Sequence, residues 1–299
     1  MVAQNQIDGS IPVSLFSIQA LGTVDVSFNK ITGVIPPTVG DAFYLNSLNV
    51  ENNFMSGRLT KSIGKAKNLR FLNLQSNKFV SDLPRELFNL EQLIDLNIGH
   101  NQFDGTILQD ISKLKMLSRL TLGPNLFTGS IPSTISSLNN LKYLSVSQIE
   151  GLDGRIPAEF GFGLTNLEEV IISGTNIEGN IDASFGLLQK LRVLEFSKNQ
   201  LRSSIPSELG NLKNLGMYHQ FRFWICLLLK IENNFCSDFS CSFNFYLSLV
   251  TLNLELNFLD GSIPDSIGNI STLKQLRLNN NVLEGDIPIS FSSLRSLGK

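Results

Sequence analysis

The sequence predicts an α/β repeat solenoid, in which short copies of one unit stack around a shared parallel β-sheet. One apolar pattern returns every 24 residues through most of the 299-residue chain, and its central part alternates apolar and polar residues at period two. A single copy cannot bury its leucines alone, so the copies must stack. The copies begin at Leu21, Leu45, Leu69, Leu93, Leu117, Leu141, Leu167, Leu191, Leu215, Leu249, Leu273 and Leu297.

Each copy follows the template L-x-x-L-x-L-x-x-N-x-L-x-G-x-I-P, as in "LSRLTLGPNLFTGSIP" at 117–132. The L-x-x-L-x-L part is typical of a short strand with one buried and one exposed face. Because stacked copies share a continuous apolar interior, each copy is expected to add one strand to a parallel sheet.

Three other template residues have separate roles. The Asn is expected to turn inward and bond backbone groups that the turn leaves unpaired. The Gly suits a backbone conformation that a side chain would oppose, and the Pro ends strand pairing and starts the outer crossover. The asparagines are Asn5, Asn29, Asn53, Asn77, Asn101, Asn125, Asn199, Asn257 and Asn281, the glycines are Gly33, Gly57, Gly105, Gly129, Gly179, Gly261 and Gly285, and the prolines are Pro36, Pro132, Pro206, Pro264 and Pro288.

This template resembles the plant-type leucine-rich repeat, and its L-x-G-x-I-P half is the distinguishing part. The resemblance implies a right-handed, curved superhelix with a parallel sheet on the concave face. It also implies a mostly irregular or 3-10 helical convex side, with short second strands near the G-x-I-P segments. Proteins with this module include the ectodomains of plant receptor-like kinases and receptor-like proteins, and the secreted polygalacturonase-inhibiting proteins.

One copy is irregular, because Leu141 and Leu167 are 26 residues apart. Ile149 or Glu150 stands where the Asn belongs, depending on the direction of counting, and the next copy has Thr175 there. Two neighbouring losses from the Asn series are expected to loosen or bend the solenoid. The irregularity is either a recognition feature or sequence drift.

A second break divides the chain into a first solenoid part at 1–215, an insertion at 216–249 and a continued, truncated solenoid at 250–299. The insertion lacks the repeat pattern and holds the three cysteines, Cys226, Cys236 and Cys241. Joining Leu215 to Val250 restores a 24-residue copy. The insertion is predicted to be poorly ordered.

The genetic code suggests that the insertion is a translated intron. Gly216-Met217-Tyr218 can be encoded with GTATGTA, the usual start of a plant intron, and Leu249-Val250 can supply a terminal AG. Excision at those points keeps the reading frame. The alternative is an island inserted to help bind a ligand, in which Cys236 and Cys241 pair.

Composition argues against several functions. With 24 basic and 26 acidic residues and no run of like charges, the chain lacks the footprint of a nucleic-acid binder. Neither a signal peptide nor a stretch long enough to span a membrane is visible. With two histidines and no metal-spaced cluster, no catalytic, cofactor or metal site is predicted, and an enzyme is the class least expected.

The exposed strand positions on the concave face are the best candidate site. We name as the concave stripe the aromatic and charged residues Phe71, Asp95, Arg119, Tyr143 and Glu169, with His100 one column away. Aromatic residues and Arg are favoured at the centres of interfaces, although the same residues could form ordinary surface pairs. Asn269 begins the sequon Asn269-Ile270-Ser271 and is a glycosylation candidate.

The sequence thus predicts a protein- or peptide-recognition module, a fragment of a plant receptor-like kinase or receptor-like protein ectodomain. The expected partners are a peptide or protein ligand on the concave face and a co-receptor. Plasma-membrane or extracellular localisation, membrane signal transduction and glycosylation follow from the resemblance only. The alternatives are a soluble inhibitor or scaffold, such as a polygalacturonase-inhibitor-like protein, and a truncated gene product without independent function.

Overall fold

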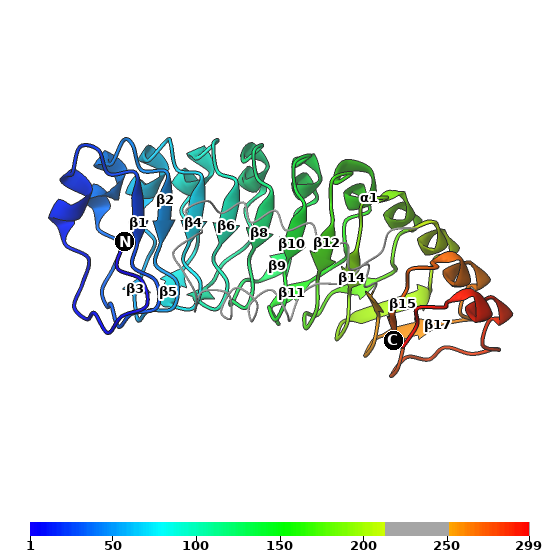
Figure 1. Ribbon diagram of the computed structural model, residues 1–299. Helices are drawn as coiled ribbons and strands as arrows, with labels where there is room; N and C mark the ends of the chain where they lie inside the picture. Colours follow the sequence, from blue (N-terminus) through cyan, green and yellow to red (C-terminus); the bar gives the residue numbers. More distant parts are fainter. Residues whose placement is uncertain (213–250, 299) are drawn as a thin grey trace.

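The chain forms a curved solenoid of stacked repeats (Figure 1), and the computed structural model describes residues 1–212 and 251–298. Each repeat contributes a three-residue strand to one parallel sheet, which has ten strands within the described residues. The strands are β1 (Thr23–Asp25), β2 (Ser47–Asn49), β4 (Phe71–Asn73), β6 (Asp95–Asn97), β8 (Arg119–Thr121), β10 (Tyr143–Ser145), β12 (Glu169–Ile171), β14 (Val193–Glu195), β16 (Thr251–Asn253) and β18 (Gln275–Arg277). The predicted fold class is confirmed.

Short strands with a second, separate pairing follow the concave strands, near the G-x-I-P segments, as expected. They form small parallel sheets in the orders β3-β5-β7, β9-β11 and β13-β15-β17. Their bounds are β3 (Ser56–Gly57), β5 (Lys78–Ser81), β7 (Gln102–Phe103), β9 (Gly129–Ser130), β11 (Leu152–Asp153), β13 (Glu178–Gly179), β15 (Gln200–Ser204) and β17 (Phe258–Asp260).

The outer side of the solenoid consists of five-residue 3-10 helices, and the template prolines stand immediately before them as N-caps. The 3-10 helices are η1 (Val13–Ser17), η2 (Pro37–Asp41), η3 (Lys61–Lys65), η4 (Arg85–Asn89), η5 (Gln109–Lys113), η6 (Ser133–Ser137), η7 (Ala183–Leu187), η8 (Ser207–Asn211), η9 (Asp265–Asn269) and η10 (Ile289–Ser293). The irregular copy instead has the short α-helix α1 (Glu159–Gly163), since its extra residue lengthens the crossover.

The core lies between the concave sheet and the outer helices. The template leucines fill the sheet side and are almost completely buried in the inner repeats. Buried phenylalanines also fill the interior, and the rings of Phe79 in β5 and Phe103 in β7 stack with their centroids 6.0 Å apart. The fully buried phenylalanines are Phe16, Phe79, Phe88, Phe103, Phe127, Phe160, Phe185 and Phe196.

The template asparagines form a ladder along the solenoid, as the sequence predicted. In a representative copy, the Asn77 amide donates to the carbonyl oxygens of Val50, at 2.8 Å, and of Leu74, at 3.2 Å, while its oxygen accepts from the backbone N–H of Met55 at 3.0 Å. Val50 and Met55 belong to the preceding repeat. Each ladder Asn therefore closes its own turn and joins two repeats.

The repeats on either side of residues 213–250 pack as immediate neighbours. β14 pairs with β16 in the same parallel register as the other concave strands. The ladder also continues, because the Asn257 amide donates to the Phe196 carbonyl oxygen at 2.9 Å and the Leu201 N–H donates to the Asn257 oxygen at 3.1 Å. The predicted insertion at 216–249 and the Cys236–Cys241 pair lie outside the described residues, and the proposed domain division remains a prediction.

The irregular copy does not interrupt the concave sheet, because β10, β12 and β14 pair in unbroken register. Ile149, at the Asn position, is completely buried. Thr175 replaces part of the missing amide, since its hydroxyl lies 2.5 Å from the Asn199 oxygen and also accepts from the Ile177 N–H at 3.3 Å. The expected loosening therefore does not reach the strand pairing.

The template glycines have φ angles between +67° and +87°, which confirms the backbone role predicted for them. Two copies carry Ser at this position, and Ser81 and Ser203 adopt the same conformation, with φ of +74° and +72°. A left-handed backbone is unfavourable for residues with a Cβ, so these two serines are held in a costly conformation by the neighbouring repeats.

Replacing Ser81 with Gly is expected to raise the free energy of unfolding by roughly 0.5–1 kcal/mol. Gly removes the steric cost of a Cβ in the left-handed conformation, and this gain is larger than the extra backbone entropy that Gly loses on folding. Denaturant unfolding measures the change. Ser130→Gly is the matched control, because Ser130 lies in β9 without a positive φ and should lose stability. Equal effects of the two substitutions would contradict the argument.

Candidate functional site

The strand register places the concave stripe in one row across the sheet. Phe71 pairs with Asp95, Asp95 with Arg119, Arg119 with Tyr143, and Tyr143 with Glu169. These residues come from five successive strands, β4 to β12, and adjacent strands lie about 4.8 Å apart. Five side chains of different chemistry therefore stand next to one another on one face.

Arg119 is the centre of this row. Its Nε lies 3.7 Å from Asp95 Oδ2, and its guanidinium carbon lies 4.3 Å from the centroid of the Tyr143 ring. The carboxylate and the ring orient the guanidinium from both sides, because Arg combines ion pairing with stacking on aromatic faces. Its side chain keeps 35% of its surface exposed, so it is accessible to a partner.

The stripe is less uniformly exposed than the sequence indicated. Tyr143 and Glu169 are only 5% and 8% exposed. Tyr143 packs with Ile171 and Val193 in a small apolar cluster on the concave side, separate from the main core. The strand pattern places Tyr143 on the exposed face and gives no sign of this cluster, because it does not encode how neighbouring side chains on that face pack together. Phe71, Asp95 and Arg119 are half-buried and form the accessible part of the stripe.

Burial raises the pKa of the Asp95 carboxyl to about 6, although the nearby Arg119 acts in the opposite direction. Burial likewise raises the pKa of the Tyr143 hydroxyl, so that the phenol stays protonated. At neutral pH, Asp95 and Arg119 therefore present a carboxylate and a guanidinium on adjacent strands, beside the neutral ring of Tyr143.

Asp95→Asn is expected to stabilise the fold at pH 7, because the folded pKa of Asp95 lies above its unfolded value and charging the carboxyl costs free energy. The cost appears as pH rises from about 4 to about 6, and its upper limit is about 3 kcal/mol. Unfolding free energies of both proteins between pH 4 and 7 test this, with the exposed Asp104→Asn as control. A carboxyl ¹³C titration of Asp95 that gives a pKa near 4 would overturn it.

His100 lies in the turn after β6 rather than on a concave strand. Its φ is +53°, and the residue just before the ladder Asn has a positive φ in most other repeats as well. The turn must reverse direction there so that the Asn side chain points inward. His100 is exposed, but it stands in a turn column beside the stripe, which the strand pattern alone did not reveal.

A second row of polar residues runs beside the stripe and is cross-linked between repeats. The Asn73 amide donates to the Glu51 carboxylate at 2.9 Å, and the Asn97 amide donates to the Gln75 amide oxygen at 2.5 Å. These hydrogen bonds hold the polar side chains beside the stripe in one conformation.

The structure also bears on the glycosylation candidate, on metal binding and on membrane-spanning helices. Asn269 is exposed at the end of η9, and its glycosylation remains a prediction. Among the described residues, no group of three His, Cys, Asp or Glu side chains is arranged to hold a metal ion. In the same part of the chain, every helix is too short or too polar to cross a membrane.

Comparison with known proteins gives the family of the repeats. The family model described as Leucine Rich Repeat matches residues 68–90, 190–212, 248–270 and 272–294. The chain is built of leucine-rich repeats. Solved plant receptors have the same fold. The plant peptide hormone receptor RGFR1, solved in complex with RGF2, is 27% identical with a TM-score of 0.80, over 98% of this leucine-rich-repeat chain and 45% of the receptor chain.

Two further structures are similar. PEPR1, solved with AtPEP1, is 25% identical with a TM-score of 0.72, and 99% of this chain aligns with 43% of that one. The Arabidopsis receptor kinase HAESA, solved with the peptide hormone IDA and the co-receptor SERK1, is 27% identical with a TM-score of 0.62, over 98% of this chain and 51% of HAESA. The leucine-rich-repeat chain thus spans about half the length of these receptor structures or less.

Proposed function

We propose that this chain is a protein- or peptide-recognition module that forms part of the ectodomain of a plant receptor-like kinase or receptor-like protein. The observation that carries the proposal is the row of Phe71, Asp95 and Arg119, three side chains of different chemistry side by side on the concave sheet. The similar receptors were solved with peptide hormones, which supports a peptide as the ligand class.

The row suits an extended peptide that crosses several strands. A peptide rises about 3.3 Å per residue, so three of its residues span about two strand spacings of 4.8 Å. Arg119 would pair with a peptide carboxylate, Asp95 with a basic group and Phe71 with an apolar side chain. Mixed polar and aromatic contacts of this kind give specificity as well as affinity.

The wider biology follows from the same proposal. HAESA was solved with a co-receptor, so we include a co-receptor as a second partner of the full protein. We further propose that the protein lies on the extracellular side of the plasma membrane, takes part in signal transduction and is glycosylated at Asn269. A full-length transcript that encodes a signal peptide, a membrane span and a kinase domain would support it, whereas one that encodes only this solenoid would favour a soluble inhibitor.

Binding can be tested on the full chain with a random peptide library displayed on phage. Selected peptides are then measured by calorimetry against Arg119→Ala and Asp95→Ala. We expect at least tenfold weaker binding for Arg119→Ala, as for a central interface Arg. The matched controls are Arg85→Ala and Asp82→Ala, an exposed basic and acidic pair away from the concave strands. Binders that are insensitive to the concave variants, or no binders at all, would refute the proposal.

A further inference from the structure

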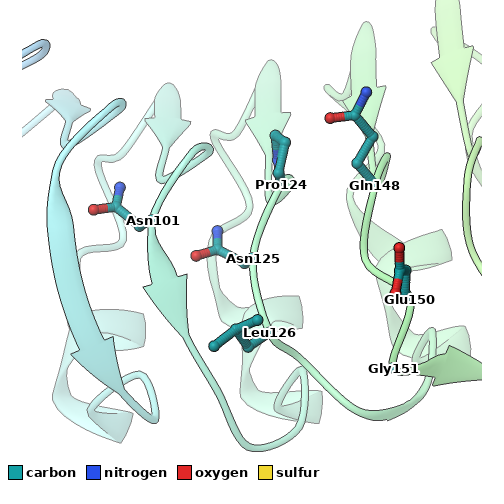
Figure 2. A pocket seen from close by; sticks show the side chains of 7 residues that line it. All are labelled: Asn101, Pro124, Asn125, Leu126, Gln148, Glu150 and Gly151. Carbon is teal, nitrogen blue, oxygen red and sulfur yellow. The ribbon is translucent and has the colours of Figure 1, made fainter.

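A recess of about 500 Å³ opens beside the concave sheet, where three successive repeats turn after β6, β8 and β10 (Figure 2). Gln148, Glu150 and Gly151 line one side on the irregular repeat. The preceding repeat supplies the opposite side, and Asn101 lies beyond it. The complete lining is Asn101, Pro124, Asn125, Leu126, Gln148, Glu150 and Gly151.

The recess is a product of the irregular copy. Ile149 occupies the ladder position, so no amide from this repeat reaches back towards Leu122, whereas Asn125 donates to Ile98 of its own preceding repeat at 2.9 Å. The extra residue in this turn lets Gly151 lie directly against the Phe127 carbonyl, where any Cβ would overlap the oxygen. The chain at 148–151 therefore takes a path that the regular copies do not follow.

The side chains of the recess differ in whether their polar atoms are already hydrogen-bonded within the protein. Asn101 and Asn125 are committed to backbone bonds in the ladder, since their oxygens accept from the N–H groups of Phe79 and Phe103. Glu150 is exposed, and its carboxylate forms no salt bridge with any residue that the structure describes. Its backbone oxygen is used, accepting from Asn176 at 2.7 Å.

Two other groups complete the chemistry. Gln148 is also exposed and lines the recess above Glu150 (Figure 2), and its amide oxygen is a second acceptor. Leu126 is 60% exposed, which is unusual for a leucine of this chain, and Pro124 is the other apolar side chain of the lining. The recess thus combines one carboxylate and one amide oxygen with an apolar wall, and its lining contains no basic side chain.

We propose that this recess binds an arginine side chain of the partner peptide or protein. The aliphatic stem of an arginine would cover Leu126 and Pro124, as long basic side chains do on apolar surfaces. Its planar guanidinium would donate two parallel N–H groups to the Glu150 carboxylate and a further one to Gln148. A lysine ammonium fits less well, because it is a strongly hydrated point charge without the fork geometry.

The inference deepens the proposed function, on which its biological meaning rests, by naming the chemistry of one ligand residue. The recess adjoins the strands that carry Arg119 and Tyr143, so one partner could reach both the stripe and the recess. The two sites have opposite preferences at their charged centres. A peptide with an acidic residue for Arg119 and an arginine for Glu150 would satisfy both.

The test uses the full chain and three probes, the N-acetyl methylamides of arginine, citrulline and lysine. Citrulline has the same shape as arginine without its charge. NMR titration follows the Leu126 methyl groups and the Glu150 carboxyl carbon. We expect saturable shifts with the arginine probe, at least tenfold weaker binding of the citrulline probe and several-fold weaker binding of the lysine probe.

Two variants complete the experiment. Glu150→Gln should weaken binding of the arginine probe at least tenfold. Glu284→Gln makes the same charge change at an exposed, distant position and should leave the affinity for the probe unchanged. Equal binding of citrulline, or an arginine affinity that survives Glu150→Gln, would overturn the assignment. Arg119→Ala should leave probe binding intact, so failure of the concave peptide assay and failure of the recess are distinguishable.

Discussion

Replacing Asn77 with Ala is expected to lower the free energy of unfolding by about 3 kcal/mol, the largest effect we predict for a single side chain outside the apolar core. The substitution leaves the Met55 N–H of the preceding repeat without its partner. It also removes one of the two amide donors to the Val50 carbonyl, which keeps the Asn53 amide at 3.1 Å. A buried backbone group without a hydrogen bond costs about 1–3 kcal/mol, and each further hydrogen bond lost costs about 0.5–1.5 kcal/mol. Asn77 itself is only 8% exposed, so water can replace it poorly.

Asn139→Ala provides the control, because it deletes the same amide from an exposed position. Surface substitutions of this kind usually change stability by less than about 0.5 kcal/mol. Urea unfolding of both variants measures the difference. A loss below 1 kcal/mol for Asn77→Ala would show that the ladder is not a main source of stability.

Deleting residues 216–249 is expected to give a folded solenoid that is about 2 kcal/mol more stable than the full chain. The flanking repeats already pair in register through β14 and β16, and Ser266 donates to the Ser207 carbonyl at 2.6 Å on the outer side. Shortening the connection between them lowers the entropy cost of closing the loop, which scales with the logarithm of its length. No contact between the described repeats has to change.

Thermal and urea unfolding of the deletion variant and the full chain test this prediction. The control deletes 37 residues, 213–249, so that Leu273 stands 45 rather than 48 residues after Leu191. The connection is then too short for the repeat, and this variant should lose stability. Lower stability of the 216–249 deletion would mean that this segment contributes to the fold, which would contradict the translated-intron hypothesis. A transcript read across codons 211–257 tests the same hypothesis at the level of the gene.

Much of the fold was predictable because each conserved position of the template has the same structural role in every repeat. Each template leucine marked a strand, each Asn marked a bonded turn, and each Gly marked a positive φ, so repetition multiplied weak local signals. Ser81 and Ser203 show where prediction from residue type fails, since the neighbouring repeats impose the left-handed conformation on residues that disfavour it. Four buried phenylalanines, Phe79, Phe103, Phe127 and Phe196, stand at template Leu positions. The four in the outer helices, Phe16, Phe88, Phe160 and Phe185, were not predicted, because the template has no fixed position there.

The candidate site was only partly predictable. Register in a parallel stack follows from the repeat length, so the row of Asp95, Arg119 and Tyr143 could be predicted from the sequence. The burial of Tyr143 and the turn position of His100 depend on side-chain packing and backbone reversal, which a strand template does not encode. The recess at Glu150 arises from an irregular turn, and only its approximate place could be predicted from the spacing.

The reach of each ladder asparagine has a consequence for how such a chain can evolve. Asn77 bonds its own turn and the repeat before it, so duplication or loss of one whole 24-residue unit recreates the same bonds at the new junction. Such an event moves the contact residues on its two sides apart or together by one strand spacing, about 4.8 Å. A lineage can therefore change the length of the ligand it reads in fixed steps, while every intermediate protein remains folded.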